Sequence, residues 1–354
     1  MSHRLDLGRS CLFSSAVIEW IRGKGPVLIV THNNPDPDSL ASATALRHLL
    51  LVLLGVESVI AFGGKIGRSE NRCMVEMLEI AAVPLEGLDL DQFQVVCMVD
   101  TQPGTGNNAF PLDREVHVVI DHHPLKPLTH NARWVDVREG YGASATMLYE
   151  YLVCQNVYLA TRMATVLFYA IKSETQDLGR EWIKADRQAY LALVPLANNK
   201  VLYEITHPEA PREYFRVFGA AINSAMVYGR ALVFNLEDVD NPDMVSELAD
   251  FLLRVEGIDT VLGVARFRGE GVVSLRTRDH TLRAGLAVQR LLKGLGTAGG
   301  HGLIAGGQVH NLPEGQQAMD DLVAKLTRRL LDVLNVEDHV GNLLVASEAT
   351  PAFD

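Results

Sequence analysis

The sequence predicts a two-domain α/β protein, in which a mostly parallel sheet forms the core of an N-terminal domain and a smaller α/β domain follows it. The 354 residues exceed the roughly 250–300 at which one hydrophobic core usually stops growing. In the first half, short apolar runs alternate with helical segments, as in parallel sheets whose two faces are covered by crossover helices. With 48% hydrophobic and 21% charged residues, the chain can also bury a sizeable core.

Short apolar runs mark the strands of the N-terminal sheet. They predict strands at Pro26–Val30, Ser58–Phe62, Gln94–Val99 and Glu115–Ile120. Helices are predicted at Ser39–Leu54, Arg68–Ile80, Ala143–Gln155, Thr161–Lys172 and Ala185–Asn198. Ser39 is placed to cap the first turn of the first of these helices.

A domain boundary is predicted after Asn198, where the sequence becomes polar and irregular and a connecting helix covers Arg212–Ser224. The N-terminal domain then spans residues 1–198, the linker residues 199–227 and the second domain residues 228–354. The second domain is predicted to contain strands at Ala231–Asn235, Thr260–Phe267 and Val272–Thr277, helices at Pro242–Val255, Leu282–Lys293 and Gln317–Leu334, and a glycine-rich loop at Gly294–Gly307.

The charge of the chain argues against binding a long nucleic acid. It carries 32 Lys and Arg against 43 Asp and Glu, a net charge of −11, whereas proteins that grip a long duplex neutralise many phosphates. We therefore expect no long duplex partner. An anionic substrate still fits if bound cations or a local basic pocket reverse the sign of the field at one site.

The remaining composition predicts a cytoplasmic protein. The longest apolar run, Leu49–Val56, is shorter than the roughly 20 residues of a membrane span, so no membrane partner is expected. The first residues lack the uninterrupted apolar core of a signal peptide. The four cysteines are widely spaced, which predicts free thiols in a reducing compartment: Cys11, Cys73, Cys97 and Cys154.

Residue types that bind metals follow three of the four predicted N-terminal strands. They are His32, Asp36 and Asp38 after the first strand, Asp100 after the third, and Asp121, His122 and His123 after the fourth. Because ligands bind outside the carboxyl ends of parallel strands, we expect these side chains to share one crevice. Taken singly, Asp100 could be a turn or capping residue, and the PDPD stretch could be a turn. The presence of metal-binding residue types at three strand ends favours one shared site.

This set of side chains favours hard divalent cations. Carboxylates and imidazoles without thiolates suit Mn²⁺ or Mg²⁺, with Zn²⁺ less favoured. The number of carboxylates indicates two ions, since anionic side chains crowded together repel unless cations lie among them. Two such ions can activate a water and neutralise charge on a phosphoryl group, so the pattern predicts phosphate-ester hydrolysis.

These segments resemble the motifs of the DHH phosphoesterase superfamily, named for the triplet found here as Asp121-His122-His123. The HNNPDPD segment at His32 is similar to the first motif of the family, and Asp100 in VVCMVD to the second. Gly299-Gly300-His301, followed by GLIAGG, resembles the signature of the DHH-associated domain. The resemblance covers nearly the whole chain and implies an active site in the cleft between the two domains.

The resemblance also implies a ligand set. One ion would be held by His32, Asp36, Asp100 and an acid of a fourth motif, and the other by Asp38, Asp100, His122 and the same acid, with Asp100 as the bridge. Family members commonly have threonine-aspartate-threonine in the fourth motif, where this chain has Ser173-Glu174-Thr175. Glu174 is the aligned ligand, and Asp177 stays open as an alternative.

The remaining implied roles are catalysis and substrate binding. His123 would contact the scissile phosphate or protonate the leaving oxygen, and Asp121 would orient a neighbouring imidazole. Arg276 resembles the arginine with which the family holds substrate, although an exposed strand arginine can also be merely solvated. The glycines at 299 and 300 let backbone N–H groups approach phosphate, and His301 adds a donor, unless this loop is a plain flexible turn.

The function implied by the resemblance is metal-dependent hydrolysis of phosphodiester or phosphomonoester bonds in short oligonucleotides or nucleotides, as in nanoRNases and adenosine bisphosphate phosphatases. Short substrates suit an acidic protein, because a few contacts in one cleft suffice. The alternatives are a cyclic-dinucleotide phosphodiesterase, an inorganic pyrophosphatase, against which the GGH segment argues, and a non-catalytic nucleotide-binding protein, which Glu174 makes conceivable. The sequence leaves homo-oligomerisation open.

Overall fold

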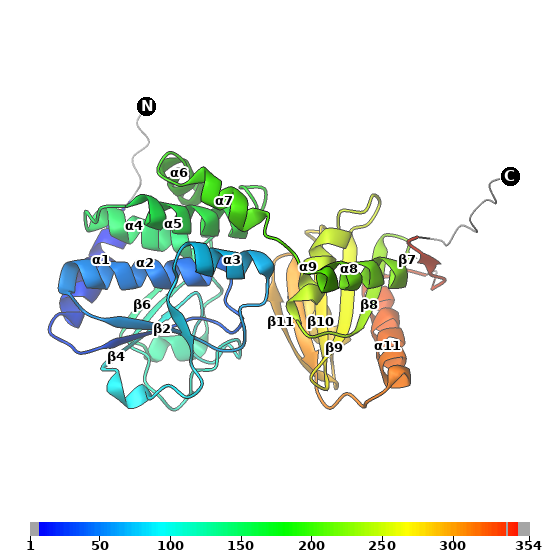
Figure 1. Ribbon diagram of the computed structural model, residues 1–354. Coiled ribbons are helices and arrows are strands. Elements are labelled where there is room, and N and C mark those ends of the chain that lie inside the picture. Colours follow the sequence, from blue (N-terminus) through cyan, green and yellow to red (C-terminus); the bar gives the residue numbers. More distant parts are fainter. Residues whose placement is uncertain (1–6, 338, 346–354) are drawn as a thin grey trace. The chain divides into compact units, whose positions relative to one another are not determined.

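The computed structural model describes residues 7–337 and 339–345. The chain divides into two compact units, an N-terminal unit of residues 1–208 and a C-terminal unit of residues 209–354, and each is described by itself (Figure 1). Both units combine helices with a sheet, as predicted. Within the described residues, no helix has the length and apolar character that crossing a membrane requires.

Within residues 7–208, six parallel strands form one sheet in the order β3-β2-β1-β4-β5-β6. They are β1 (Val27–Val30), β2 (Ser58–Phe62), β3 (Ala82–Pro84), β4 (Val95–Val99), β5 (Val118–Asp121) and β6 (Trp134–Val137). The central strands β1 and β4 are apolar and buried throughout, as expected for strands covered on both faces. The strand order reverses between β1 and β4, which is where open α/β sheets bind their ligands.

Among residues 7–208, α-helices cover only one face of this sheet, so the prediction of helices on both faces is wrong. The helices of the unit are α1 (Gly8–Ile21), α2 (Pro37–Leu54), α3 (Ser69–Met77), α4 (Ser144–Cys154), α5 (Thr161–Glu174), α6 (Lys184–Leu193) and α7 (Asn199–Thr206). The opposite face packs against apolar side chains from the connections between β3, β4, β5 and β6. These connections carry short 3-10 helices, η1 (Leu90–Gln92) and η2 (Pro127–Asn131), in place of α-helices.

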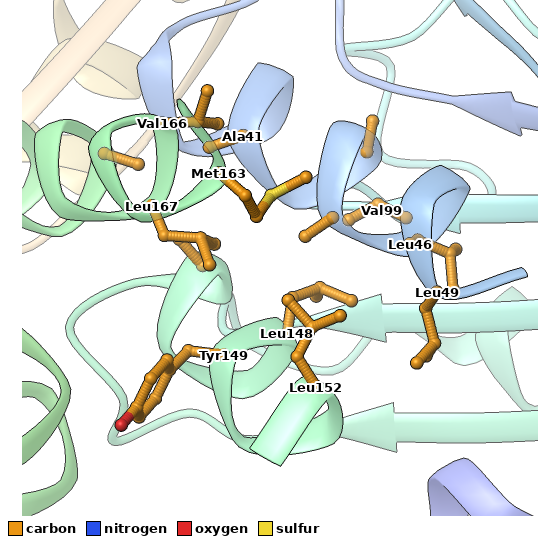
Figure 2. Packing of buried hydrophobic residues seen from close by; sticks show 14 of the residues in the cluster. Ala41, Leu46, Leu49, Val99, Leu148, Tyr149, Leu152, Met163, Val166 and Leu167 are labelled. Atoms are coloured by element: carbon orange, nitrogen blue, oxygen red, sulfur yellow. The ribbon is translucent and has the colours of Figure 1, made fainter. Parts of the chain in front are cut away.

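The helical face is held by a close-packed apolar layer (Figure 2). Ala41, Leu46 and Leu49 of α2 lie in one buried cluster with Leu148 of α4 and Leu167 of α5. Burial of a leucine contributes roughly 1.5–3 kcal/mol, so this layer fixes α2, α4 and α5 against one another. The ends of these helices carry several of the residues predicted to form the site.

The start of α2 differs from its prediction at one residue. Ser39 is the predicted cap of the helix, but Asp36 is the observed N-cap, and its Oδ1 accepts a hydrogen bond from the N–H of Ser39 at 2.9 Å. Pro37 takes the first helical position, where its missing N–H is not needed. The helix therefore begins two residues earlier and includes Asp38 in its first turn.

In the described part of the C-terminal unit, seven strands form a mixed sheet in the order β11-β12-β10-β9-β8-β7-β13. The elements are α8 (Arg212–Ser224), β7 (Met226–Tyr228), β8 (Ala231–Asp238), α9 (Asp243–Leu252), β9 (Thr260–Phe267), β10 (Glu270–Thr277), α10 (Ala284–Leu291), β11 (Gly296–His301), β12 (Ile304–Val309), α11 (Gln316–Leu334) and β13 (Asn342–Leu343). Alternate residues of β8 pack against α8 and α9 on one face and against α10 and α11 on the other.

The predicted glycine-rich loop is a β-hairpin made of β11 and β12. Its glycines allow close packing. A Cβ at Gly285 of α10 would lie 2.3 Å from the carbonyl oxygen of Gly300, and a Cβ at Gly307 would lie 2.3 Å from Leu292. The high glycine content therefore reflects the close approach of α10 to the hairpin, and not an irregular loop.

Cys11 and Cys154 form a disulfide that joins α1 to the last residue of α4, so the prediction of free thiols is wrong for this pair. The two cysteines are 143 residues apart in sequence, and only the packing of α1 on α4 brings them together. Among the described residues, Cys73 and Cys97 are free. The predicted cytoplasmic location loses the support of free thiols and stays a prediction.

Reduction of this disulfide is expected to lower the free energy of unfolding of the N-terminal unit by about 2–4 kcal/mol, because the crosslink restricts the unfolded chain. All three tryptophans, Trp20, Trp134 and Trp182, lie in this unit, so their fluorescence in a urea titration reports its unfolding. The control is Cys154→Ser. Its urea midpoint of unfolding should match that of reduced wild type, and reductant should not change it. A wild-type midpoint that reductant leaves unchanged would contradict the crosslink.

Candidate metal centre

The predicted ligands converge at the carboxyl ends of β1, β4 and β5, and Asp100 lies at their centre. Its Oδ2 is 3.5 Å from Nε2 of His32, and its Oδ1 is 3.5 Å from Nε2 of His122. Asp36 reaches the same region, with its Oδ1 3.5 Å from Nε2 of His32. Each carboxylate oxygen of Asp100 therefore faces a different histidine.

Two groups of ligand atoms share Asp100. The first is His32, Asp36 and Asp100, and the second is Asp100, His122 and His123; in each group the ligand atoms lie within 4.8 Å of one another. This spacing suits two cations with one carboxylate between them. Asp38 lies at the edge of the second group, with its Oδ2 3.8 Å from Nε2 of His122.

The backbone of Asp100 adopts a left-handed conformation with φ of 59°. Its N–H still bonds to the carbonyl oxygen of Ile120 in β5 at 2.9 Å, so the chain leaves the sheet at this residue. Aspartate is one of the few residues other than glycine that tolerate this conformation. The hydroxyl of Ser144 donates to Oδ1 of Asp100 at 2.9 Å and holds the carboxylate in place.

The two histidines that face Asp100 are held in the tautomer that suits a metal ligand. Nδ1 of His122 donates to the carbonyl oxygen of Tyr141 at 2.9 Å, and Nδ1 of His32 donates to that of Asn33 at 2.9 Å. A carbonyl can only accept, so the neutral ring of each presents a lone pair at Nε2. Within the described part of the chain, Nε2 of His122 is buried without a hydrogen-bond partner, which fits a cation in this position.

Asp38 is buried at the N-terminus of α4. One oxygen accepts from the N–H of Ser144 and the other from the N–H of Ala145, both at 2.7 Å. The first N–H groups of a helix favour a negative charge, so α4 orients this carboxylate. A carboxylate has further lone pairs, so these bonds leave Asp38 able to bind a cation as well.

Asp121 is buried and orients His123. Its Oδ1 accepts from Nδ1 of His123 at 2.8 Å, and its Oδ2 accepts from the side-chain amide of Gln102 at 2.7 Å. Burial alone would lower the pKa of His123, but the hydrogen bond to Asp121 and the charges of Asp100 and Asp121 together raise it. The hydrogen bond thus orients the imidazole of His123, and the catalytic roles of both residues stay predictions.

The cluster is short of positive charge. Burial, followed by the charge of Asp100, raises the pKa of Asp38 well above its usual range, and burial, followed by the charge of Asp36, raises the pKa of Glu174 to about 7. Burial alone would lower the pKa of His122, but the charges of Asp100 and Asp38 raise it to about 10. Protons on these groups compensate the carboxylates, and bound cations would replace them.

Glu174 and Asp177, the two candidates for the fourth motif, have different surroundings. Glu174 is the last residue of α5, and its charge interacts with Asp36 and Asp100. The side chain of Asp177 is 56% exposed, forms an ion pair with Lys172 and accepts from the hydroxyl of Tyr190 at 2.9 Å. Asp177 is therefore engaged at the surface, and Glu174 is the acid associated with the cluster.

The predicted substrate residues lie on neighbouring strands of the C-terminal sheet. Arg276 of β10 is 7% exposed, and its Nε donates to Oδ1 of Asp250 at 2.8 Å. In the register of the sheet, Arg276 pairs with Ile304 of β12, which in turn pairs with His301 of β11. Gly299 and Gly300 precede His301 on the same strand. Substrate binding by these four residues stays a prediction.

Family comparisons agree with this arrangement of motifs. Residues 26–171 match the DHH family, N-terminal domain, and residues 228–331 match the DHHA1 domain. The chain belongs to the DHH family. The first match contains the three strand ends that form the cluster, and the second contains the hairpin of β11 and β12.

The DHH-family chain also has a relative that is similar over most of its length. An uncharacterized protein of Methanocaldococcus jannaschii is 34% identical over 322 residues, which cover 89% of the chain. The chain spans 65% of the length of that relative.

Two solved structures share the fold. An exopolyphosphatase-related protein from Bacteroides fragilis has a TM-score of 0.70 at 14% identity, over 91% of this chain and 98% of that chain. RecJ from Thermus thermophilus, in complex with Mn²⁺, has a TM-score of 0.50 at 14% identity, over 94% of this chain and 55% of that chain.

The residues that support the ligands in this DHH-family fold are hard to recognise from sequence. Tyr141 and Ala145 act through their backbone groups, which carry no side-chain signature. Ser144 is explained almost as well as a helix cap. Gln102 follows β4 by three residues and bonds to Asp121, and its position after a strand end is the one signal that could have singled it out.

Proposed function

We propose that this protein is a metal-dependent phosphohydrolase that cleaves phosphodiester or phosphomonoester bonds of short oligonucleotides or nucleotides. The observation that carries the proposal is Asp100, whose two oxygens face the Nε2 atoms of His32 and His122 at 3.5 Å each. Two divalent cations bound around this carboxylate would supply an activated water and neutralise charge on the phosphoryl oxygens.

The proposed ligands fall into two sets. His32, Asp36 and Asp100 form one, and Asp38, Asp100 and His122 form the other. Glu174 is the proposed further ligand, because its charge interacts with the cluster while Asp177 bonds elsewhere. Mn²⁺ is the proposed ion, with Mg²⁺ as the alternative, since carboxylate and imidazole ligands suit both. The Mn²⁺ complex of the RecJ structure supports a divalent cation of this kind.

His123 is the proposed catalytic residue outside the ligand sets. Its Nδ1 is engaged by Asp121 at 2.8 Å, which fixes the plane of the ring. A histidine held in this way can donate to a phosphoryl oxygen or deliver a proton to the leaving oxygen. Asp121 contributes by orientation and by stabilising the charged imidazole.

In the C-terminal unit, Arg276, Gly299, Gly300 and His301 are the proposed substrate contacts. The register brings them onto neighbouring strands, and backbone N–H groups of glycines can approach phosphate oxygens closely. A chain with a net charge of −11 favours a small substrate that needs a few such contacts over a long strand that needs an extended basic surface.

The test is a hydrolysis panel with the metal-stripped full chain to which Mn²⁺ is added back. The substrates are a ribodinucleotide, adenosine 3′,5′-bisphosphate, a cyclic dinucleotide and pyrophosphate. We expect kcat/KM for one of the first two to exceed that for the others by at least about tenfold, a 1.4 kcal/mol preference. Activity should be absent in EDTA and return with Mn²⁺.

Three other outcomes of the hydrolysis panel would each indicate a different function. Faster release of phosphate from pyrophosphate would make the protein a pyrophosphatase, and preference for the cyclic dinucleotide would make it a cyclic-dinucleotide phosphodiesterase. Binding of two ions without turnover of any substrate would identify a non-catalytic nucleotide-binding protein.

A further inference from the structure

We propose that Asp186 is a positioning residue for one of the two metal positions, the one formed by Asp38 and His122. It would act through residues 141–145, which we call the anchor segment. This inference rests on the proposed metal centre. Asp186 lies in the first turn of α6 and is fully buried, although burying a carboxylate is costly unless it is well bonded.

The anchor segment contacts several of the proposed ligands. The carbonyl oxygen of Tyr141 accepts from Nδ1 of His122, the N–H groups of Ser144 and Ala145 bind the two oxygens of Asp38, and the hydroxyl of Ser144 binds Asp100. These bonds are 2.7–2.9 Å long. A shift of the segment would therefore move Asp38 and His122, the two ligands that only this position uses.

Asp186 holds the anchor segment from the other side. Its Oδ2 accepts from the N–H of Gly142 at 2.8 Å, and its Oδ1 accepts from the hydroxyl of Thr146 at 2.6 Å. Oδ2 also accepts from the N–H of Ile183 at 2.8 Å, which ties the carboxylate to the start of α6. Hydrogen bonds to a buried carboxylate are short and strong. Gly142 within the segment and Thr146, the residue that follows it, are therefore both fixed to α6.

Steric contact at Gly142 fixes the segment as well. A Cβ at this residue would lie 2.7 Å from the carbonyl oxygen of Glu181 and 2.8 Å from Cγ2 of Thr175. Both distances are shorter than a carbon atom can accept, so only glycine lets the segment approach this closely. Gly142→Ala therefore offers a second way to displace the segment without removing the Asp186 carboxylate.

The two ligands that only the other metal position uses, His32 and Asp36, are held independently of the anchor segment. In the part of the chain that the structure describes, His32 is bonded through Nδ1 to the carbonyl oxygen of Asn33, and Asp36 accepts from the N–H of Ser39. Both bonds lie within residues 32–39, at the junction of β1 and α2. Loss of Asp186 should therefore weaken one cation position selectively.

The test is Mn²⁺ titration of the metal-stripped full chain by calorimetry, with Asp186→Asn compared with wild type. Wild type should bind two ions. In Asp186→Asn we expect one of the two dissociation constants to rise by about tenfold or more, the lower end for residues that orient metal ligands, and the other to change less than about twofold. Gly142→Ala should give the same asymmetry.

Electron paramagnetic resonance with two equivalents of Mn²⁺ gives a second readout that general destabilisation would not change. Wild type should show the broad signal of coupled ions, and Asp186→Asn should show the six-line signal of a single bound Mn²⁺. Leu193→Ala is the matched control, because Leu193 lies on the same helix, is fully buried and packs in the apolar cluster. Its melting temperature should fall while both dissociation constants stay at wild-type values.

Equal weakening of both positions in Asp186→Asn, or the same change in Leu193→Ala, would overturn the positioning role. Unchanged dissociation constants in Asp186→Asn would overturn it too. The number of ions bound by wild type is measured before any variant. If wild type does not bind two ions, the proposed metal centre itself is wrong, and this outcome is distinct from failure of the positioning role.

Discussion

Asp100→Asn is expected to lower kcat/KM on the preferred phosphate substrate by more than about 100-fold, the upper end for residues that only orient a metal ligand. Asp100 faces both histidines, so its charge serves both proposed cation positions. Asparagine keeps the shape but loses the charge and half of the acceptor capacity. Wild type should be stabilised by about 2.7 kcal/mol at an Mn²⁺ concentration of 100 Kd, whereas the variant should gain much less.

Asp177→Asn is a matched control for this substitution. Asp177 also has a left-handed backbone, with φ of 56°, but its side chain bonds at the surface to Lys172 and Tyr190. The same chemical change in the same backbone conformation should leave activity and Mn²⁺ stabilisation near wild type. Because asparagine tolerates this conformation, Asp100→Asn should fold normally in the absence of metal. If Asp100→Asn kept wild-type rates and Mn²⁺ stabilisation, the shared-ligand assignment would be wrong.

Arg138→Met is expected to lower the free energy of unfolding of the N-terminal unit by about 3–5 kcal/mol, as for other buried ion pairs that lose one partner. The Arg138 side chain is 5% exposed and bonds to Asp136, Glu150 and the hydroxyl of Ser10. Methionine fills much of the same volume but leaves the buried Glu150 without its cation and Asp136 with only the exposed Arg9. The network also ties β6 to α1 and α4.

Tryptophan fluorescence during urea unfolding measures this loss, because all three tryptophans lie in the N-terminal unit. Arg162→Met is the control. Arg162 forms an ion pair with Glu79 but is 61% exposed, so its loss should change stability by no more than about 1 kcal/mol. Adding Glu150→Gln to Arg138→Met should restore part of the stability, since it removes one uncompensated charge. A loss no larger than that of the control would contradict the network's contribution.

Much of the N-terminal fold and of the candidate site could be predicted from sequence. Strands β1, β2 and β4 are apolar runs that begin and end within a residue of their predictions, because central parallel strands are buried on both faces. The ends of β1, β4 and β5 carry residue types that have few structural reasons to coincide. That coincidence, and not any single residue, located the cluster.

The strands that were not predicted lack a clear hydrophobic pattern in their sequence. Strands β3 and β6 lie at the two edges of the sheet, have three and four residues, and pair with one neighbour each. Edge strands need little apolar character, so no clear pattern marks them. The hairpin of β11 and β12 was missed because its glycines allow close packing against α10. The spacing of residues in the sequence does not indicate such a tertiary contact.

The support of the candidate site was the least predictable part. Asp186 follows Asp38 by 148 positions, and the two carboxylates are related only through the backbone N–H groups of the anchor segment. Backbone donors are present at almost every residue, so their use leaves no trace in the sequence. The disulfide between Cys11 and Cys154 was hidden for a similar reason, because it depends on how α1 packs.

The backbone conformation of Asp100 limits how this metal centre can be redesigned. A cysteine or glutamate introduced there to attract a softer or larger ion would meet steric strain from its own main chain before any coordination chemistry was tested. Asp38, in the first turn of a regular helix, imposes no such restriction. Altered ion selectivity is therefore better sought by exchanging the helical carboxylate than the central one.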